Sequence, residues 1–194
     1  MNMKAIQNNK GFSLTEILLV IGIAATVIIA TFIAYRVAFS SSNVNSEVKI
    51  AGQIAQDITE MYAMAPNYGG IDTDSVIQNG LVPSERVPGG YSTGNKIIHN
   101  LSSDGEGVIE VDSVTDSNST NNSGQYLRIQ FTNVPSKECI DLSKQSSQYF
   151  DIIYIGSGSS GGDEVKEQGE ELDISSLVEE CNNRNDNVVS LIKA

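Results

Sequence analysis

The sequence is poor in the residues from which most enzyme sites are built. Its 194 residues include one histidine, His99, and two cysteines, Cys139 and Cys181. With one histidine, a serine–histidine–aspartate triad cannot be assigned with confidence. The two cysteines lack the paired spacing of a zinc site. The glycine-serine segment 156–162 lacks the Gly-Lys-Ser/Thr ending of a phosphate-binding loop. We therefore expect no enzymatic activity, no catalytic residue, no cofactor and no metal ion.

Positive charge is also scarce. Twelve lysines and arginines oppose 24 acidic residues, which gives a net charge of −12. A protein that grips the phosphates of nucleic acid needs clustered lysine and arginine, so no direct nucleic-acid binding is predicted. The acidic surplus is typical of an exposed, soluble surface.

One long stretch carries no charge at all. From Ile17 to Ala34 the residues are isoleucine, leucine, valine, alanine and phenylalanine, apart from Gly22, Thr26 and Thr31. As a helix this run rises about 27 Å, close to the thickness of the hydrocarbon core of a bilayer. A soluble core helix seldom stays apolar on every face for this length. A secretory signal is the alternative, but its apolar region is usually shorter and ends in a small-residue cleavage site.

A single carboxylate, Glu16, stands at the start of this run. Placing it against hydrocarbon costs on the order of 3 kcal/mol on insertion scales, so a functional role is the default hypothesis. The alternative is that Glu16 merely occupies the first turn of a helix, where the helix dipole favours an anion by about 0.3–1 kcal/mol. A short polar segment with Lys4 and Lys10 comes before it, followed by Gly11 and Phe12.

Residues 11–16, Gly-Phe-Ser-Leu-Thr-Glu, and the apolar helix after them resemble the class III signal of type IV pilins and their pseudopilin relatives. The resemblance implies a leader of residues 1–11, which a prepilin peptidase removes by cutting between Gly11 and Phe12. It also implies that Phe12 becomes an N-methylated terminus and that Glu16 pairs with this terminal amine on a neighbouring subunit. Thr15 departs from the bulky apolar residue that is most common before the glutamate.

The same resemblance implies an α+β fold, in which a long N-terminal helix packs against the antiparallel β-sheet of a head. Residues 12–39 are then the hydrophobic half of the helix, which lies in the membrane or in the assembly. Residues 40–65 are the amphipathic half, which packs on the head. Residues 66–194 form the globular head.

The sequence of the second half of the helix carries a matching pattern. Pro66 ends it, because the residue before a proline avoids the α region. Apolar residues recur at steps of four and three, which places them on one core-facing stripe: Val44, Val48, Ala51, Ala55, Ile58, Tyr62 and Ala65. The polar residues fall outside this stripe: Glu47, Lys49, Gln53, Gln56, Asp57 and Glu60.

In the head, short helices and strands are expected in succession. Helices are predicted at 72–78, where Asn79-Gly80 supplies a left-handed stop, at 135–145 and at 174–181. Alternating and β-branched residues predict strands at 96–100, 107–114, 126–134, 149–155 and 188–192. The connector 116–124 is nearly all asparagine, serine and threonine, which predicts a solvated turn.

Both cysteines lie in the part of the chain that the resemblance places outside the cytoplasm. An even number of cysteines in an oxidising compartment favours a disulfide, and two buried free thiols are the alternative. By resemblance, the pair is the C-terminal disulfide of the family, and residues 139–181 are a loop exposed on the fibre. The wide separation resembles type IVb pilins, whereas Phe12 and the short leader resemble type IVa.

The stretch Asp163 to Asp186 carries nine acidic residues against Lys166 and Arg184. A solvated face is one interpretation, and a patch that meets a basic partner is the other. Calcium would suit such a loop, but no Asp-x-Asp-x-Asp-Gly spacing is present.

The resemblance therefore predicts the major pilin of a type IV pilus, of the type IVb kind, polymerising with itself into an extracellular fibre. Such a fibre serves adhesion, aggregation, motility or DNA and conjugative transfer. A minor pilin or a type II secretion pseudopilin is an alternative in the same family. A membrane-anchored periplasmic binding domain that never polymerises is a third hypothesis.

The predicted partners are other copies of the chain, the prepilin peptidase, the inner-membrane assembly machinery and, before assembly, membrane lipid. Lys4 and Lys10 place the N-terminus in the cytoplasm by the positive-inside rule. The head then lies in the periplasm of a bacterium until the subunit joins the extracellular fibre.

Overall fold

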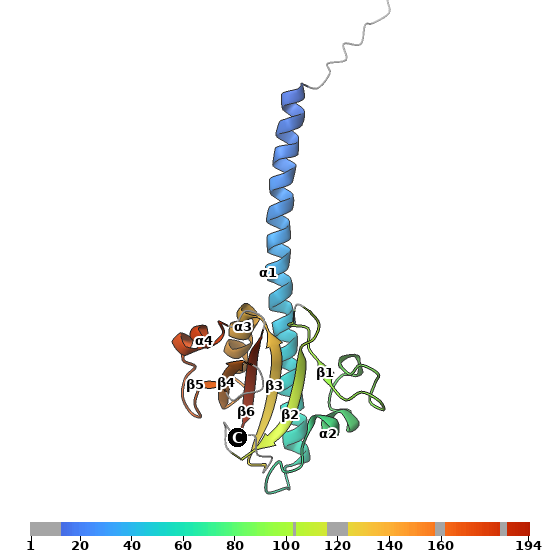
Figure 1. Ribbon diagram of the computed structural model, residues 1–194, viewed down its shortest axis with the longest axis vertical. Helices are drawn as coiled ribbons and strands as arrows, with labels where there is room; N and C mark the ends of the chain where they lie inside the picture. Colours follow the sequence, from blue (N-terminus) through green and yellow to red (C-terminus); the bar gives the residue numbers. More distant parts are fainter. Residues whose placement is uncertain (1–12, 103, 116–123, 158–161, 183–185) are drawn as a thin grey trace, which may run out of the picture. The chain divides into compact units, whose positions relative to one another are not determined.

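The computed structural model describes residues 13–102, 104–115, 124–157, 162–182 and 186–194 (Figure 1). The chain divides into two compact units, Met1–Phe39 and Ser40–Ala194. Helix α1, Leu14–Met61, contributes residues to both units. The predicted first helical residue, Phe12, lies outside the described residues, as does most of the connector 116–124.

The described part of the first unit is almost entirely helical, and from Ile17 to Phe32 its side chains are apolar except at Thr26 and Thr31. All side chains from Ser13 to Phe32 are exposed. Within the described residues, Leu14–Phe32 is the one helical segment long and apolar enough to cross a membrane. The Thr26 hydroxyl donates to the Ile23 carbonyl at 2.8 Å, so this polar group is satisfied inside its own helix.

The C-terminal end of α1 comes earlier than the sequence predicted. The helix ends at Met61 instead of Ala65. The amides of Ala63 and Ala65 bond to carbonyls three residues back, at 3.3 and 2.9 Å, and not four. The backbone therefore tightens into turns ahead of Pro66, a residue that disfavours the α conformation before it.

A single antiparallel sheet forms the centre of the second unit, which confirms the predicted α+β class (Figure 1). Its order is β1-β2-β3-β6-β4-β5, and every pair is antiparallel. The C-terminal strand therefore lies between β3 and β4, inside the sheet. The strands are β1 (Ile97–Ile98), β2 (Val108–Val114), β3 (Tyr126–Val134), β4 (Ile152–Ser157), β5 (Asp163–Lys166) and β6 (Asn187–Lys193).

The sequence did not predict β5. The strand has four residues, of which three are charged and only Val165 is buried. A pattern of charged residues is typical of a loop, and β5 forms because β4 supplies a partner for it.

Two helices of the head begin at a capping aspartate, and the other two begin after a proline. They are α2 (Thr73–Gln78), the 3₁₀ turn η1 (Ser84–Arg86), α3 (Ser136–Ser146) and α4 (Ile174–Glu180). The Asp72 carboxylate accepts the Ser75 amide at 2.7 Å and caps α2. Gly80 has a φ of +67°, the left-handed conformation that was predicted to stop this helix.

The core fills the space between the second half of α1 and the sheet. Val48, Ala51 and Ile58 on α1 belong to the same buried cluster as Ile129 and Phe131 on β3. Along β3 the buried residues alternate with partly exposed Arg128, Gln130 and Thr132, as the period-two pattern predicted.

The prediction for Glu47 was wrong. The sequence pattern placed this residue outside the core-facing stripe of the helix, yet its side chain is 0% exposed. The carboxylate contacts the Arg86 guanidinium at 2.8 Å and accepts the Asn100 amide at 3.0 Å. Burial raises the pKa of Glu47, and these two partners oppose that shift. The pair ties η1 and the end of β1 to α1.

We predict that Glu47→Gln destabilises the head by about 3–5 kcal/mol, because it leaves the Arg86 charge buried without its partner. Urea unfolding of the full chain in detergent measures this. Glu60→Gln, an exposed acid of the same helix, is the control and should change stability by less than about 0.5 kcal/mol. Equal effects of the two substitutions would contradict the role of the pair.

His99 lies beside this pair and is 2% exposed. Its Nε2 lies 2.7 Å from the Thr132 carbonyl, and its Nδ1 accepts the Leu101 amide at 3.1 Å. This arrangement fits the neutral ring, with the proton on Nε2. Burial, aided by the nearby Arg86 charge, lowers the pKa of His99 to about 4. The single histidine is thus a core residue.

The lowered pKa predicts acid sensitivity. Between pH 6.5 and about 4 the unfolded chain binds a proton that folded His99 does not, so stability is present above pH 6.5 and falls as the pH drops. The loss is roughly 3 kcal/mol over this range. His99→Gln keeps a donor and an acceptor without titrating. Wild type should therefore lose more free energy of unfolding than His99→Gln as the pH falls from 6.5 to about 4. A difference between the two proteins that does not change with pH would refute this.

Candidate assembly site

Glu16 lies in the first turn of α1 with an exposed side chain. Its Oε2 accepts the backbone amide of Ser13 at 3.2 Å. Ile17, Val20 and Ile21 line a surface hollow beside it. Within the part of the chain that the structure describes, Glu16 has no cationic partner, and a backbone amide leaves its charge uncompensated in an apolar setting.

The predicted processing residues Gly11 and Phe12 lie outside the described residues. The roles of Gly11, Phe12 and Glu16 therefore stay predictions. The geometry adds that the Glu16 carboxylate and the apolar surface around it point outward from one chain, available to lipid or to another copy.

The structure contains a disulfide between Cys139, on α3, and Cys181, at the end of α4. Both cysteines are buried, and they lie 42 positions apart in the sequence. The bond closes a loop that contains β4, β5 and α4. Val165 and Leu177 are the buried apolar side chains that β5 and α4 contribute.

The acidic stretch that begins at Asp163 forms an exposed face over β5 and α4. Burial and the neighbouring charges of Asp163 and Glu179 raise the pKa of Glu180. Ile174 and Val178 stand among these acids and are 48% and 52% exposed. Sequence reasoning predicted the acidic face but not its apolar centre, although the four-residue spacing of Ile174 and Val178 on a helix was a signal.

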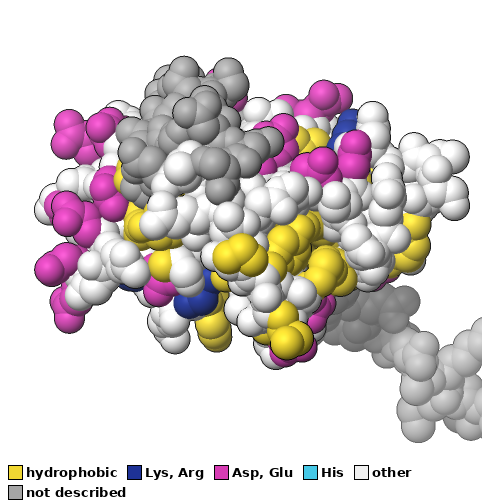
Figure 2. Space-filling view, turned by 90° about the horizontal axis from the view of Figure 1, so that it is seen from below, with side chains coloured by type: hydrophobic (Ala, Val, Ile, Leu, Met, Phe, Trp, Pro, Cys, Tyr) yellow, Lys and Arg dark blue, Asp and Glu magenta, His cyan; other side chains and the backbone are white. Residues whose placement is uncertain are grey.

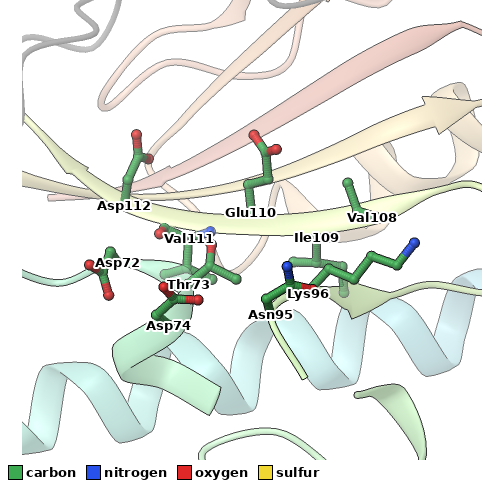
Figure 3. Close-up of a pocket in the computed structure, with 10 residues that line it drawn as sticks. All are labelled: Asp72, Thr73, Asp74, Asn95, Lys96, Val108, Ile109, Glu110, Val111 and Asp112. Atoms are coloured by element: carbon green, nitrogen blue, oxygen red, sulfur yellow. Dashed lines mark hydrogen bonds between the residues drawn. The ribbon is translucent and has the colours of Figure 1, made fainter. Parts of the chain in front are cut away.

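A polar pocket of about 330 Å³ lies at the edge of β2 (Figure 3). Figure 3 shows the Glu110 and Asp112 side chains on the opposite side of β2 from Thr73 and Asp74. Asp112 binds Arg128 at 2.9 Å, and Asp72 caps α2. The acids of this pocket therefore do not converge, and among the described residues no group of three potential ligands could hold a metal ion.

Hydrophobic side chains also gather at the end of the head where α1 finishes. Met61 and Met64 are exposed there, Met64 fully. Figure 2, which views the molecule from below, shows hydrophobic side chains near the middle of this face and acidic ones along its rim.

We predict that removing the disulfide with Cys139→Ala and Cys181→Ala lowers the stability of the head by about 4 kcal/mol, because a loop of this length regains chain entropy in the unfolded state. Urea unfolding of the oxidised wild type and the double variant measures the difference. A loss below about 1 kcal/mol would contradict the stabilising role.

Comparison with known proteins gives the family. The family model described as PilS N terminal matches residues 41–194. The chain is also similar to the solved type IV b pilin from Salmonella typhi, with 20% identity and a TM-score of 0.51, over 76% of this chain and 97% of that one. TcpA, a type IV pilin from Vibrio cholerae El Tor biotype, has 14% identity and a TM-score of 0.50, over 79% of this chain and 99% of that one. No curated protein sequence matches the chain.

The structural likenesses show the fold alone at these identities, whereas the family model covers most of the chain. Together they agree with the α+β fold, in which a long helix packs against an antiparallel head. The chain belongs to the PilS family of type IV pilins, has a fold like that of the solved type IV b pilin, and is a structural protein, not an enzyme.

Proposed function

We propose that the chain is the major pilin of a type IV pilus, which polymerises through its N-terminal helix into an extracellular fibre. The observation that carries the proposal is the exposure of Leu14–Phe32, a mainly apolar helical segment that the described residues of its own chain leave uncovered. Such a surface needs lipid or other protein around it. Lipid covers it before assembly, and neighbouring helices cover it in the fibre.

Glu16 supplies the specific interaction. A carboxylate among apolar neighbours is stable only when a cation and hydrogen bonds compensate its charge. Cleavage after Gly11 creates a cation in the required place, the amine of Phe12, at the start of the same apolar segment of a neighbouring copy. An N-methyl group on this amine keeps its positive charge. The pair fixes the register between helices that apolar contacts alone would leave free to slide.

Assembly exchanges contacts between helix and lipid for contacts between helices. Lipid tails are as apolar as leucine, so this exchange gains little free energy from the burial of apolar surface. Close packing of the helices and polar pairs between them make assembly favourable. In this role residues 1–11 are the leader, 12–39 the assembly half of the helix, 40–65 the half that packs on the head, and 66–194 the head.

The same proposal fixes partners and location. The prepilin peptidase cuts at Gly11 on the cytoplasmic side of the bacterial inner membrane. The inner-membrane assembly machinery then extracts the helix, and the head moves from the periplasm to the fibre surface. Adhesion, aggregation, motility and conjugative transfer are the tasks that such a fibre performs.

We predict that sheared surface filaments consist mainly of this chain and that its N-terminal residue is N-methylated Phe12. Glu16→Ala should be processed normally but should lower the filament yield by at least about tenfold, because the neighbouring amine loses its counter-ion in an apolar setting. Mass spectrometry and electron microscopy of sheared filaments measure both results.

Asp57→Ala, which removes an exposed acid further along the same helix, is the control and should leave the yield unchanged. Normal filaments from Glu16→Ala would contradict the charge pair. Mature chains that keep residues 1–11, without any filament, would contradict polymerisation. A chain found in filaments only as a trace component would be a minor pilin.

A further inference from the structure

Thr15 is a polar residue at the start of the apolar helix, and the proposed function gives it no role. It stands where the resemblance predicts a bulky apolar side chain. Its side chain is exposed in the first turn of α1, next to Glu16. Its hydroxyl lies 2.6 Å from the Ser13 hydroxyl, and the two form a hydrogen bond. Valine has the same shape without a polar group to satisfy, so apolar contacts alone would favour valine here.

The other two threonines of the apolar helix satisfy their hydroxyls within the helix. The Thr26 hydroxyl donates to the carbonyl three residues earlier at 2.8 Å. The Thr31 hydroxyl donates to the carbonyls four and three residues earlier, at 3.0 and 2.9 Å. Bonds of this kind are the usual way for a threonine to stay in an apolar helix. In contrast, the partner of the Thr15 hydroxyl among the described residues is another hydroxyl.

Ser13 holds the Thr15 hydroxyl and the Glu16 carboxylate close to each other. Its amide donates to Glu16 Oε2 at 3.2 Å, and its hydroxyl binds Thr15 Oγ1. The Ser13 carbonyl also accepts the Glu16 amide at 3.0 Å, which begins the helix. Side chains of a helix tilt toward its N-terminus, so the Thr15 hydroxyl and the carboxylate are directed to the same end. The first turn therefore presents a carboxylate and a hydroxyl pair that are linked through one residue.

These groups can accept more hydrogen bonds than they accept from one another. A carboxylate has roughly four lone-pair positions, and the Ser13 amide occupies one of those of Glu16. Two hydroxyls have two O–H donors and about four lone pairs, and the bond between Ser13 and Thr15 uses one donor and one lone pair. The first turn therefore keeps acceptors of two kinds, carboxylate and hydroxyl, for a donor from outside.

The amine that we propose as the partner of Glu16 carries matching donors. An N-methylated terminal amine is a secondary ammonium with two N–H bonds, which diverge at the tetrahedral angle. One carboxylate accepts one of these N–H groups in line, but not both, because hydrogen bonds weaken when they are strongly bent. The second N–H needs an acceptor of its own, since a charged donor without a partner is costly in apolar surroundings.

We propose that the Thr15 hydroxyl is this second acceptor. The methylated Phe12 amine of one copy donates one N–H to Glu16 of a neighbouring copy and the other to Thr15 Oγ1 of the same neighbour. Ser13 of that neighbour positions both acceptors. The inference rests on the proposed polymerisation and N-methylation, and it adds a specificity-determining residue to the assembly site. A charge attracts a cation from many directions, whereas a second hydrogen bond fixes the direction of the amine and with it the register of the two helices.

Replacing Thr15 tests the contact, because Thr15→Val keeps the shape of the side chain and removes the hydroxyl. The full chain should still be cut after Gly11 and N-methylated, but the yield of sheared filaments should fall by about tenfold, since a charged donor loses its acceptor. Thr15→Ser keeps a hydroxyl at this position and should keep the yield within roughly threefold of wild type. Mass spectrometry measures the processing, and electron microscopy measures the yield.

Thr31→Val is the matched control. It removes a hydroxyl from the same exposed apolar helix, but one that its own helix satisfies. The yield should stay within roughly twofold of wild type. A loss as large as that of Thr15→Val would overturn the proposal, because the effect would then belong to any threonine of the helix.

A high-resolution structure of wild-type filaments distinguishes the amine contact from a role of Thr15 in the helix alone. The amine nitrogen should lie within about 3.2 Å of a Glu16 carboxylate oxygen and of Thr15 Oγ1 on the same neighbouring copy. An amine that contacts Glu16 but lies more than about 4 Å from Thr15 Oγ1 would overturn the proposal.

The outcomes also separate this contact from polymerisation. Normal filaments from Thr15→Val would overturn the role of Thr15 and leave the pairing of Glu16 intact. Thr15→Val chains that keep residues 1–11 would overturn it too, because the hydroxyl would then serve processing. Wild-type chains that form no filaments would contradict the proposed polymerisation itself, and this inference with it.

Discussion

The solvation of helix α1 is the constraint on which the rest of the structure depends. The run from Ile17 to Phe32 is uncharged, predominantly apolar and exposed, while residues of the second half pack into the head core. One helix therefore carries two surfaces that need different surroundings. The head buries the apolar side chains of the second half. The described residues leave the first half exposed, and the proposed function places it in lipid or against the helices of other copies.

The head is built to hold the second half of α1 firmly. The C-terminal strand β6 lies in the middle of the sheet, so the sheet is complete only when the whole chain has folded. The Glu47–Arg86 pair ties the segment after α2 to the helix, and the disulfide ties α4 to α3. Each link joins an element at the margin of the head to its centre.

Much of this was readable from the sequence because it depends on local patterns. Strand β3 follows from the alternation around Ile129, and the start and stop of α2 follow from Asp72 and Gly80. Glu47 was misplaced because its partner, Arg86, is distant in sequence, and the core-facing stripe cannot reveal a buried ion pair. Strand β5 was missed because its neighbour β4, and not its own composition, makes it a strand. The partner of Glu16 cannot be found by analysing one chain alone, because the proposal places this partner on another copy.

The most direct test of the account is a high-resolution structure of sheared filaments. The account predicts a central bundle in which Leu14–Phe32 of each copy contacts the helices of other copies, with the Glu16 carboxylate at ion-pair distance from the Phe12 amine of a neighbour. Filaments in which these helices are not in contact, or in which Glu16 faces no amine, would contradict it.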